Sequence, residues 1–276
     1  MKLLFIGDIV GRPGRDLVRR AVKVLSRSWQ IDVVIANGEN AAAGAGITRE
    51  HAEDFFKAGV HCVTGGNHSW DRREIIAFID QEPRLLRPAN YPPGTPGRGA
   101  TIVHTADQTA VGILNVMGRV FLSPLEDPFA VADREIESLR ARGARVILVD
   151  VHAETTSEKI ALSWWLDGRV TAVIGTHTHV QTADERILPG GTACLTDAGM
   201  TGPHESVIGM DRDAVITRFR TGMPIRFEPA TGDPRLNGVV VTADAETGRA
   251  IAIERINMSA ADLDELAARH LAEIGS

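Results

Sequence analysis

Cysteine is nearly absent from this chain of 276 residues, which contains only Cys62 and Cys194. Two cysteines so far apart, one of them inside the apolar run 60–63, exclude a disulfide framework and a zinc site built from thiolates. We expect both to be buried, reduced thiols. Long apolar runs are lacking too, and the apolar start at residues 3–6 is too short for a signal peptide and is broken at once by Asp8. These features predict a cytoplasmic protein with no membrane partner.

An excess of positive charge is also lacking. The chain has 30 Lys and Arg against 36 Asp and Glu, so its formal net charge is −6. This balance gives no chain-wide electrostatic reason to bind a nucleic-acid backbone, and we expect no long nucleic acid as a partner. Apolar residues make up 43% and charged residues 24%, which is ordinary for a globular chain. We expect a single domain over residues 1–276.

Short apolar runs alternate with helical patterns along the first two thirds of the chain. The runs typical of buried parallel strands are 3–6, 33–36, 60–64, 110–117, 145–151 and 170–174. The helical patterns between or after them are 16–29, 49–58, 71–80, 129–142 and 156–166. This alternation is typical of an α/β fold with parallel sheets.

The last third has a different pattern. Runs at 214–219, 225–228, 238–243 and 251–256 are predicted to be antiparallel strands without helices between them. Ser259 and Asp262 resemble a capping box that starts a terminal helix. The stretch 84–99 is rich in proline and glycine, which predicts a surface loop acting as a lid or a dimer contact. The whole pattern predicts a four-layer α/β/β/α sandwich of mixed sheets.

Polar side chains follow five of the predicted strands. They are Asp8, Glu39 with Asn40, Asn67 with His68, His152, and His177 with His179. Because the carboxyl ends of parallel strands share one edge of a sheet, we expect these side chains to converge. Oxygen and imidazole ligands without thiolates suit catalytic Mn, Fe or Zn. Without His68 the set still exceeds what one tetrahedral ion needs, which favours two ions sharing a carboxylate, as in phosphoester hydrolysis.

Each of these residues also has a purely structural interpretation. Asp8 would serve as the N-cap of the following helix, and Asn40 as a turn residue. His152 alone would be a structural histidine. The strongest motif is His177-Thr178-His179, because in an extended segment residues two apart point to the same side. His204 is predicted to lie in a loop near the site with no direct role, and Arg12 either contacts substrate phosphate or is solvated.

Five blocks in order resemble the metallophosphoesterase (calcineurin-like) superfamily, and most closely its YmdB-like branch. They are Gly7-Asp8, Gly38-Glu39-Asn40, Gly65-Gly66-Asn67-His68-Ser69-Trp70-Asp71, Val151-His152-Ala153-Glu154 and Gly175-Thr176-His177-Thr178-His179-Val180. The resemblance implies a first metal held by Asp8, Glu39, Asn40 and His179, and a second held by Glu39, Asn67, His152 and His177. It implies His68 as the catalytic acid.

The same resemblance implies the cofactors and the reaction. The metals would be two divalent or mixed-valence ions, Fe or Mn or both, with Zn as an alternative. The activity would be hydrolysis of 2′,3′-cyclic nucleotides or similar small phosphodiesters, with a metal-bridging hydroxide attacking phosphorus, in a cytoplasmic protein that forms homo-oligomers. Three alternatives stay open: a phosphomonoesterase on the same site, a metal-containing regulatory protein, and an accessory protein or nuclease of RNA turnover.

Overall fold

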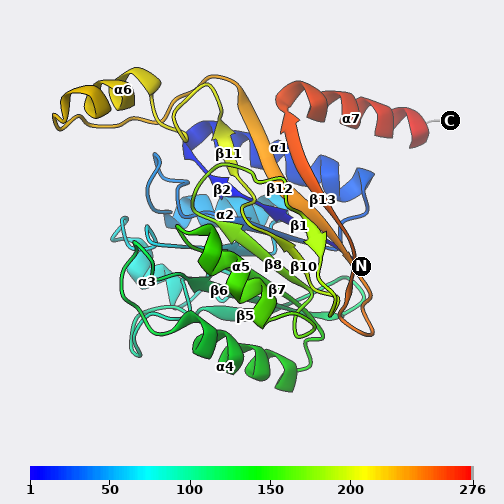
Figure 1. Ribbon diagram of the computed structural model, residues 1–276. Coiled ribbons are helices and arrows are strands. Elements are labelled where there is room, and N and C mark those ends of the chain that lie inside the picture. The colour runs from blue at the N-terminus through cyan, green and yellow to red at the C-terminus, as the bar shows by residue number, and fades with distance from the viewer. Residues whose placement is uncertain (275–276) are drawn as a thin grey trace.

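The fold combines helices and strands throughout the chain. The structure is a computed structural model that describes residues 1–274 (Figure 1). The helices within these residues are α1 Gly11–Ser28, α2 Arg49–Ala58, α3 Ile75–Ile79, α4 Pro128–Ala141, α5 Thr156–Trp165, α6 Arg212–Thr221 and α7 Ala260–Ile274. The strands are β1 Lys2–Ile6, β2 Asp8–Ile9, β3 Val33–Asn37, β4 Cys62–Thr64, β5 Ala100–His104, β6 Ala110–Met117, β7 Val146–His152, β8 Ala172–Thr176, β9 Arg186–Ile187, β10 Ala193–Leu195, β11 Met200–Pro203, β12 Pro234–Ala243 and β13 Ala250–Ser259.

The strands form two mixed sheets. The first has the order β2-β11-β12-β1-β3-β4, with β13 also paired to β12. Within it β1, β3 and β4 are parallel, as predicted, while β12 is antiparallel to both β1 and β13. The second sheet has the order β5-β6-β7-β8-β10-β9. Its strands β6, β7, β8 and β10 are parallel, and β5 and β9 are antiparallel strands at its edges.

Strand β1 contributes to two separate apolar clusters because its side chains alternate between the faces of the first sheet. Leu4 packs in a cluster with Leu25 of α1, whereas its neighbour Phe5 packs in a cluster with Leu148 of the second sheet. A third cluster joins the second sheet to α4 and α5, where it includes Leu162. Figure 1 shows α1 and α7 along one side of the molecule and α4 along the opposite side. Burial on both faces explains why the parallel strands are continuous apolar runs.

Several sequence predictions are confirmed in this fold. Cys62 and Cys194 are buried and form no disulfide. Burial raises the pKa of the Cys62 thiol, which keeps it protonated. At the start of α7, Ser259 Oγ accepts from the N–H of Asp262 at 3.2 Å, and Asp262 Oδ2 accepts from the N–H of Ser259 at 2.7 Å, which completes the capping box. Within residues 1–274 the structure contains no helix long and apolar enough to cross a bilayer.

Two predicted strands are wrong. Residues 214–219 lie in helix α6, whose N-cap Asp211 accepts from the N–H of Ala214 at 2.9 Å and whose C-cap Gly222 has a left-handed φ of 69°. Both caps are helix signals, and here they outweigh the β-branched residues between them. Residues 225–228 form no strand. The predicted helix at 71–80 shortens to α3.

The stretch 84–99 is only partly a surface loop. Leu85 and Leu86 are buried, and short β-bridges join them to β4 and to Arg98. The Arg87 side chain is 8% exposed and donates hydrogen bonds to five carbonyl groups, those of Pro88, Ala89, Thr95, Pro96 and Gly97. A buried guanidinium thus satisfies the backbone of a proline-rich segment that lacks regular structure. The tip of the loop, at 92–94, is exposed, as are Arg84 and Arg98 near its two ends.

Candidate metal centre

The predicted site residues come from both sheets rather than from one. Asp8 lies in β2, and Glu39 and Asn67 follow β3 and β4 of the first sheet. His152 is the last residue of β7, and His177 directly follows β8 of the second sheet. The prediction of a single shared sheet edge is therefore wrong in detail, because the face-to-face packing of two sheets brings these strand ends together.

Four side-chain atoms converge on one side of the centre. His152 Nε2 lies 2.9 Å from Asn67 Oδ1, 3.2 Å from Glu39 Oε1 and 3.1 Å from His177 Nδ1. All four atoms are ones that ligate metals. Glu39, His152 and His177 together offer ligand atoms close enough to bind one ion. This half of the site joins one sheet to the other.

A second group of side chains lies on the other side of Glu39. Asn40 Nδ2 is 3.1 Å from Glu39 Oε1 and 3.1 Å from His179 Nε2. His179 Nε2 is in turn 3.9 Å from Asp8 Oδ1. Glu39 therefore lies between two groups, one with Asp8, Asn40 and His179 and the other with Asn67, His152 and His177.

The two carboxylates of the centre are buried, and histidine rather than lysine or arginine lies beside them. Asp8 is fully buried and Glu39 is 1% exposed, and neither forms an ion pair with lysine or arginine in residues 1–274. Asp8 Oδ1 is buried and has no hydrogen-bond partner among the described residues. Burial raises the pKa of Asp8. Burial also raises the pKa of Glu39, but the charge and hydrogen bond of His152 outweigh it and lower that pKa to about 2.

The histidines respond to the same charges. Burial lowers the pKa of His152, but the neighbouring carboxylates, Glu39 first, raise it to about 9. Burial and the charge of His152 lower the pKa of His177 to about 4, so His177 is neutral, as a metal ligand must be. The donor chemistry and the unpartnered Asp8 oxygen thus fit bound metal ions.

Gly66 shows how closely the backbone approaches this centre. A Cβ atom at Gly66 would lie 2.2 Å from Glu39 Oε2 and 2.4 Å from His152 Nε2. These distances are far below van der Waals contact, so any side chain at this position would displace two of the converging groups. Glycine at position 66 therefore lets the backbone come close to the converging side chains.

His68 lies at the rim of the centre. Its backbone N–H donates to Glu39 Oε2 at 3.1 Å, while its side chain is 37% exposed. His68 Nδ1 is 2.8 Å from Asp71 Oδ2, so the Nε2 edge of the ring is the one left for another group. The sequence reasoning assigned no role to Asp71, although it belongs to the block that contains Asn67 and His68. His68 and Asp71 are three positions apart in a turn, and this spacing is the feature of the sequence that indicates their contact.

The turn 177–179 is not extended, contrary to the prediction. His177 and His179 have φ angles of 97° and 65°, in the left-handed region that non-glycine residues rarely adopt. Their side chains consequently diverge, one toward each group of ligands. Thr178 between them donates from its N–H and its hydroxyl to Asp197 Oδ2, at 3.1 and 2.7 Å. The same oxygen is 2.7 Å from the buried Lys159 Nζ.

Two further acidic residues near the centre were missed. Glu154 Oε2 lies 2.9 Å from His177 Nε2 at the half-exposed edge of the site. Asp150 lies fully buried beneath the centre, two residues before His152. Glu154 stands in a block that resembles the family, which is a usable signal. Asp150 stands inside an apolar strand, where only its polarity marks it.

The structural alternative for Asp8 has a clear outcome. Helix α1 starts after the N-cap residue Val10 and has no side-chain cap, so Asp8 is not an N-cap.

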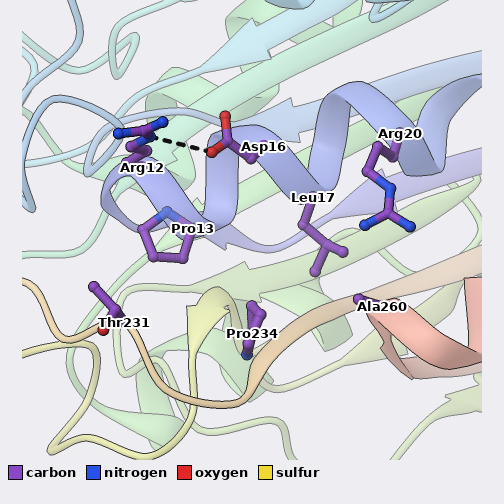
Figure 2. Close-up of a pocket in the computed structure, with 8 residues that line it drawn as sticks. All are labelled: Arg12, Pro13, Asp16, Leu17, Arg20, Thr231, Pro234 and Ala260. Carbon is purple, nitrogen blue, oxygen red and sulfur yellow. Dashed lines mark hydrogen bonds and ion pairs between the residues drawn. The ribbon is translucent and has the colours of Figure 1, made fainter.

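Arg12 is 84% exposed and pairs with Asp16 at 3.4 Å. Arg12 and Asp16 line a cavity of about 450 Å³ together with Pro234 and other residues (Figure 2). None of the predicted ligands lines this cavity. Arg12 is thus solvent-exposed in this structure, and its contact with substrate phosphate stays a prediction.

His204 lies near the centre without joining it. Its Nδ1 is 3.0 Å from the carbonyl of Gly202, and its Nε2 is 3.1 Å from Asn237 Nδ2. It lines a cavity of about 530 Å³ that also reaches His179. Both ring nitrogens are thus engaged by groups other than the predicted ligands.

Comparison with known proteins agrees with this geometry. A family model described as YmdB-like protein matches residues 4–256. The chain belongs to the YmdB-like family. A relative from Bacillus subtilis (strain 168), named 2′,3′-cyclic-nucleotide 2′-phosphodiesterase, is 51% identical over 256 residues, which are 93% of this chain and 96% of the relative. The resemblance found in the sequence is confirmed.

Solved structures show the same YmdB-like fold. A hypothetical protein from Thermus thermophilus has a TM-score of 0.87 and 43% identity, over 94% of this chain and 99% of that one. A structure described as a novel phosphatase, from Mycoplasma pneumoniae, has a TM-score of 0.87 and 36% identity, over 94% and 93% of the two chains. A 5′-nucleotidase precursor, also from Thermus thermophilus, at 15% identity and a TM-score of 0.59, shares the fold over 99% of this chain and 59% of that one.

Proposed function

We propose that this chain is a metal-dependent phosphodiesterase that hydrolyses 2′,3′-cyclic nucleotides or similar small phosphodiesters. It is an enzyme that hydrolyses phosphoric esters, as its family and its phosphodiesterase and phosphatase relatives show. The observation that carries the finer proposal is the convergence of ligand side chains from both sheets around two buried carboxylates. Asp8 Oδ1 is buried without a hydrogen-bond partner, and a bound cation would satisfy it.

The proposed centre holds two ions that share Glu39. Asp8, Glu39, Asn40 and His179 would hold the first, and Glu39, Asn67, His152 and His177 would hold the second. The position of Glu39 between the two groups supports this division. Oxygen and imidazole donors without thiolates support Fe or Mn or both, with Zn as the alternative.

Such a metal pair, when bound, activates water and neutralises charge on the phosphoryl group. The chain itself supplies the ligands, a backbone at Gly66 that leaves room for them, and a proton donor. We assign that donor to His68, whose Nδ1 is held by Asp71 and whose Nε2 edge is free to protonate the leaving oxygen.

The finer description of the architecture is also a proposal. A four-layer α/β/β/α sandwich, forming a single domain over residues 1–276, is supported by the three apolar clusters, which lie between helices and first sheet, between the sheets, and between second sheet and helices. The cytoplasmic location and the homo-oligomer stay predictions from the sequence.

The experiment that tests the function combines metal analysis with substrate comparison. The purified protein is assayed before and after chelation and after metal add-back, on 2′,3′-cyclic AMP, bis-p-nitrophenyl phosphate, p-nitrophenyl phosphate and a short RNA. We expect metal-dependent cleavage of the two small diesters. Faster cleavage of the monoester would favour the phosphomonoesterase alternative, and cleavage of RNA alone would favour the RNA-turnover alternative. Activity that survives complete removal of metal would contradict the metal-dependent mechanism.

A further inference from the structure

Asp150 is a buried carboxylate beneath the centre that binds no lysine or arginine within residues 1–274. Its Oδ1 accepts a hydrogen bond from Thr176 Oγ1 of β8 at 2.7 Å. Its Oδ2 accepts from Thr64 Oγ1 of β4 and, at 3.1 Å, from Asn37 Nδ2 of β3. Three neutral donors from three other strands, on both sheets, thus surround one carboxylate directly under the ligand cluster.

The hydrogen bond from Thr176 determines where the proton of His152 lies. A threonine hydroxyl has one proton, and Thr176 gives it to Asp150. Thr176 Oγ1 lies 2.9 Å from His152 Nδ1, and with its own proton given to Asp150 it can only accept a hydrogen bond from that nitrogen. His152 Nδ1 must therefore carry a hydrogen, and Nε2, which faces Asn67 and Glu39, is the nitrogen left to bind a metal.

Asp150 also reaches Glu39, the carboxylate between the two ligand groups. Asn37 donates from Nδ2 to Asp150 and accepts, through Oδ1, the backbone N–H of Glu39 at 3.1 Å. One buried carboxylate thereby orients a ligand on each sheet. The Thr64 hydroxyl also donates to Asp150, but unlike the Thr176 hydroxyl it forms no hydrogen bond with a proposed metal ligand.

We infer that Asp150 and Thr176 are positioning residues, which fix the Nδ1–H tautomer of His152 and so present its Nε2 to the metal centre. The inference rests on the metal centre of the proposed function, and it concerns residues that do not touch metal or substrate. Partners of this kind orient metal-bound histidines and raise their affinity for metal.

Two matched substitutions separate positioning from simple stability. Thr176→Val and Thr64→Val each remove one buried hydroxyl that donates to Asp150, in side chains 0% and 1% exposed. Metal affinity is measured by competition with a chromophoric chelator, and folding by urea unfolding of the metal-free protein. We expect Thr176→Val to weaken metal binding by about 10- to 100-fold, and Thr64→Val to leave it near that of the parent. Thr176→Ser, which restores the hydroxyl, is expected to restore affinity.

Asp150→Asn tests the direction of the hydrogen bonds. The amide oxygen is expected to face the two donors Thr64 and Asn37, which leaves the amide nitrogen to donate to Thr176. The Thr176 proton would then point at His152 Nδ1 and move the imidazole hydrogen to Nε2. With zinc present, NMR of ¹⁵N-labelled histidine is expected to show His152 with Nδ1–H and a zinc-bound Nε2 in the parent and in Thr176→Ser. In Asp150→Asn it is expected to show the hydrogen on Nε2 and no zinc bound to that nitrogen.

The outcomes separate this inference from the proposed function. A parent protein that binds no metal in the chelator competition would remove the proposed centre altogether. A parent that binds metal while Thr176→Val and Thr64→Val lose equal affinity, or while Thr176→Val loses none, would overturn the positioning role and leave the centre intact. Should Thr176→Val fail to fold, the comparison of Asp150→Asn with Thr176→Ser decides by the same NMR signal.

Discussion

Gly66 leaves no space for a side chain between Glu39 and His152. Gly66→Ala would place a methyl group 2.2 Å from Glu39 Oε2 and 2.4 Å from His152 Nε2. Because these side chains belong to the proposed metal centre and not to an apolar cluster, we expect loss of most bound metal and of activity with little change in the free energy of unfolding of the metal-free protein. Metal content by elemental analysis and urea unfolding measure the two effects.

Gly112→Ala serves as the control for crowding alone. The added methyl would meet Ile147, Leu139 and Ala144 at 3.2–3.3 Å, in an apolar cluster away from the ligands. We expect this variant to lose stability and to keep its metal. If Gly66→Ala behaved in the same way, the ligand positions around Gly66 would be wrong.

His68 is expected to contribute to the reaction without contributing to metal binding. In His68→Ala the backbone N–H that donates to Glu39 remains, so metal content should equal that of the parent. The proton donor is lost, and we expect kcat for diesters to fall by about 10²- to 10⁴-fold. Steady-state kinetics beside metal analysis test this, with the exposed His104→Ala as control. An unchanged kcat would remove His68 from the role of acid.

At the scale of elements, the ion pair of Lys159 and Asp197 anchors the strained turn after β8. It joins α5 to the segment after β10, and both side chains are almost completely buried. Lys159→Met would leave the Asp197 carboxylate buried without its cation, and we expect a loss of about 3–5 kcal/mol in the free energy of unfolding. The double variant Lys159→Met/Asp197→Asn should recover part of that loss, as a double-mutant cycle by urea unfolding would show. Strictly additive losses would mean that the two charges do not interact.

The sequence predicted those elements whose local pattern agrees with their burial. β1, β3 and β4 are apolar runs because both of their faces are covered, and polar residues at their ends are conspicuous. β2 and β9 have two residues each, too few for any periodic pattern. Residues 214–219 contain β-branched and aromatic residues, and only the caps Asp211 and Gly222 indicate a helix.

The contrast between local pattern and tertiary packing also explains which parts of the site could be predicted from the sequence. The proposed ligand residues lie at or just after strand ends and could be proposed from the sequence, but their division between two sheets depends on packing that no local pattern encodes. Asp150 and Thr64 are 86 positions apart, and their contact exists only in the folded chain. Buried polar residues inside apolar strands, such as Asp150, have no periodic signal, so their roles became visible only through their hydrogen bonds.

At the scale of the whole molecule, metal binding and folding are expected to be linked. The ligands come from strands of both sheets, so an unfolded chain has no preformed centre. An ion that binds only the folded state at 100 times its dissociation constant adds about 2.7 kcal/mol of stability. We therefore expect chelation to lower the melting temperature measured by calorimetry, and Glu39→Gln to abolish this dependence on metal. A melting temperature that chelation leaves unchanged in the metal-loaded parent would contradict the linkage.

The proposed ligands that precede the exposed tip at 92–94 differ in chemistry from those that follow it. Every oxygen donor, Asp8, Glu39, Asn40 and Asn67, precedes it, and every imidazole, on His152, His177 and His179, follows it. Of the proposed ligands, a polypeptide severed at this tip would keep only the carboxylates and amides on one fragment and only the imidazoles on the other. Neither fragment alone would carry the mixed donor set, so hydrolysis would depend on the two pieces reassembling.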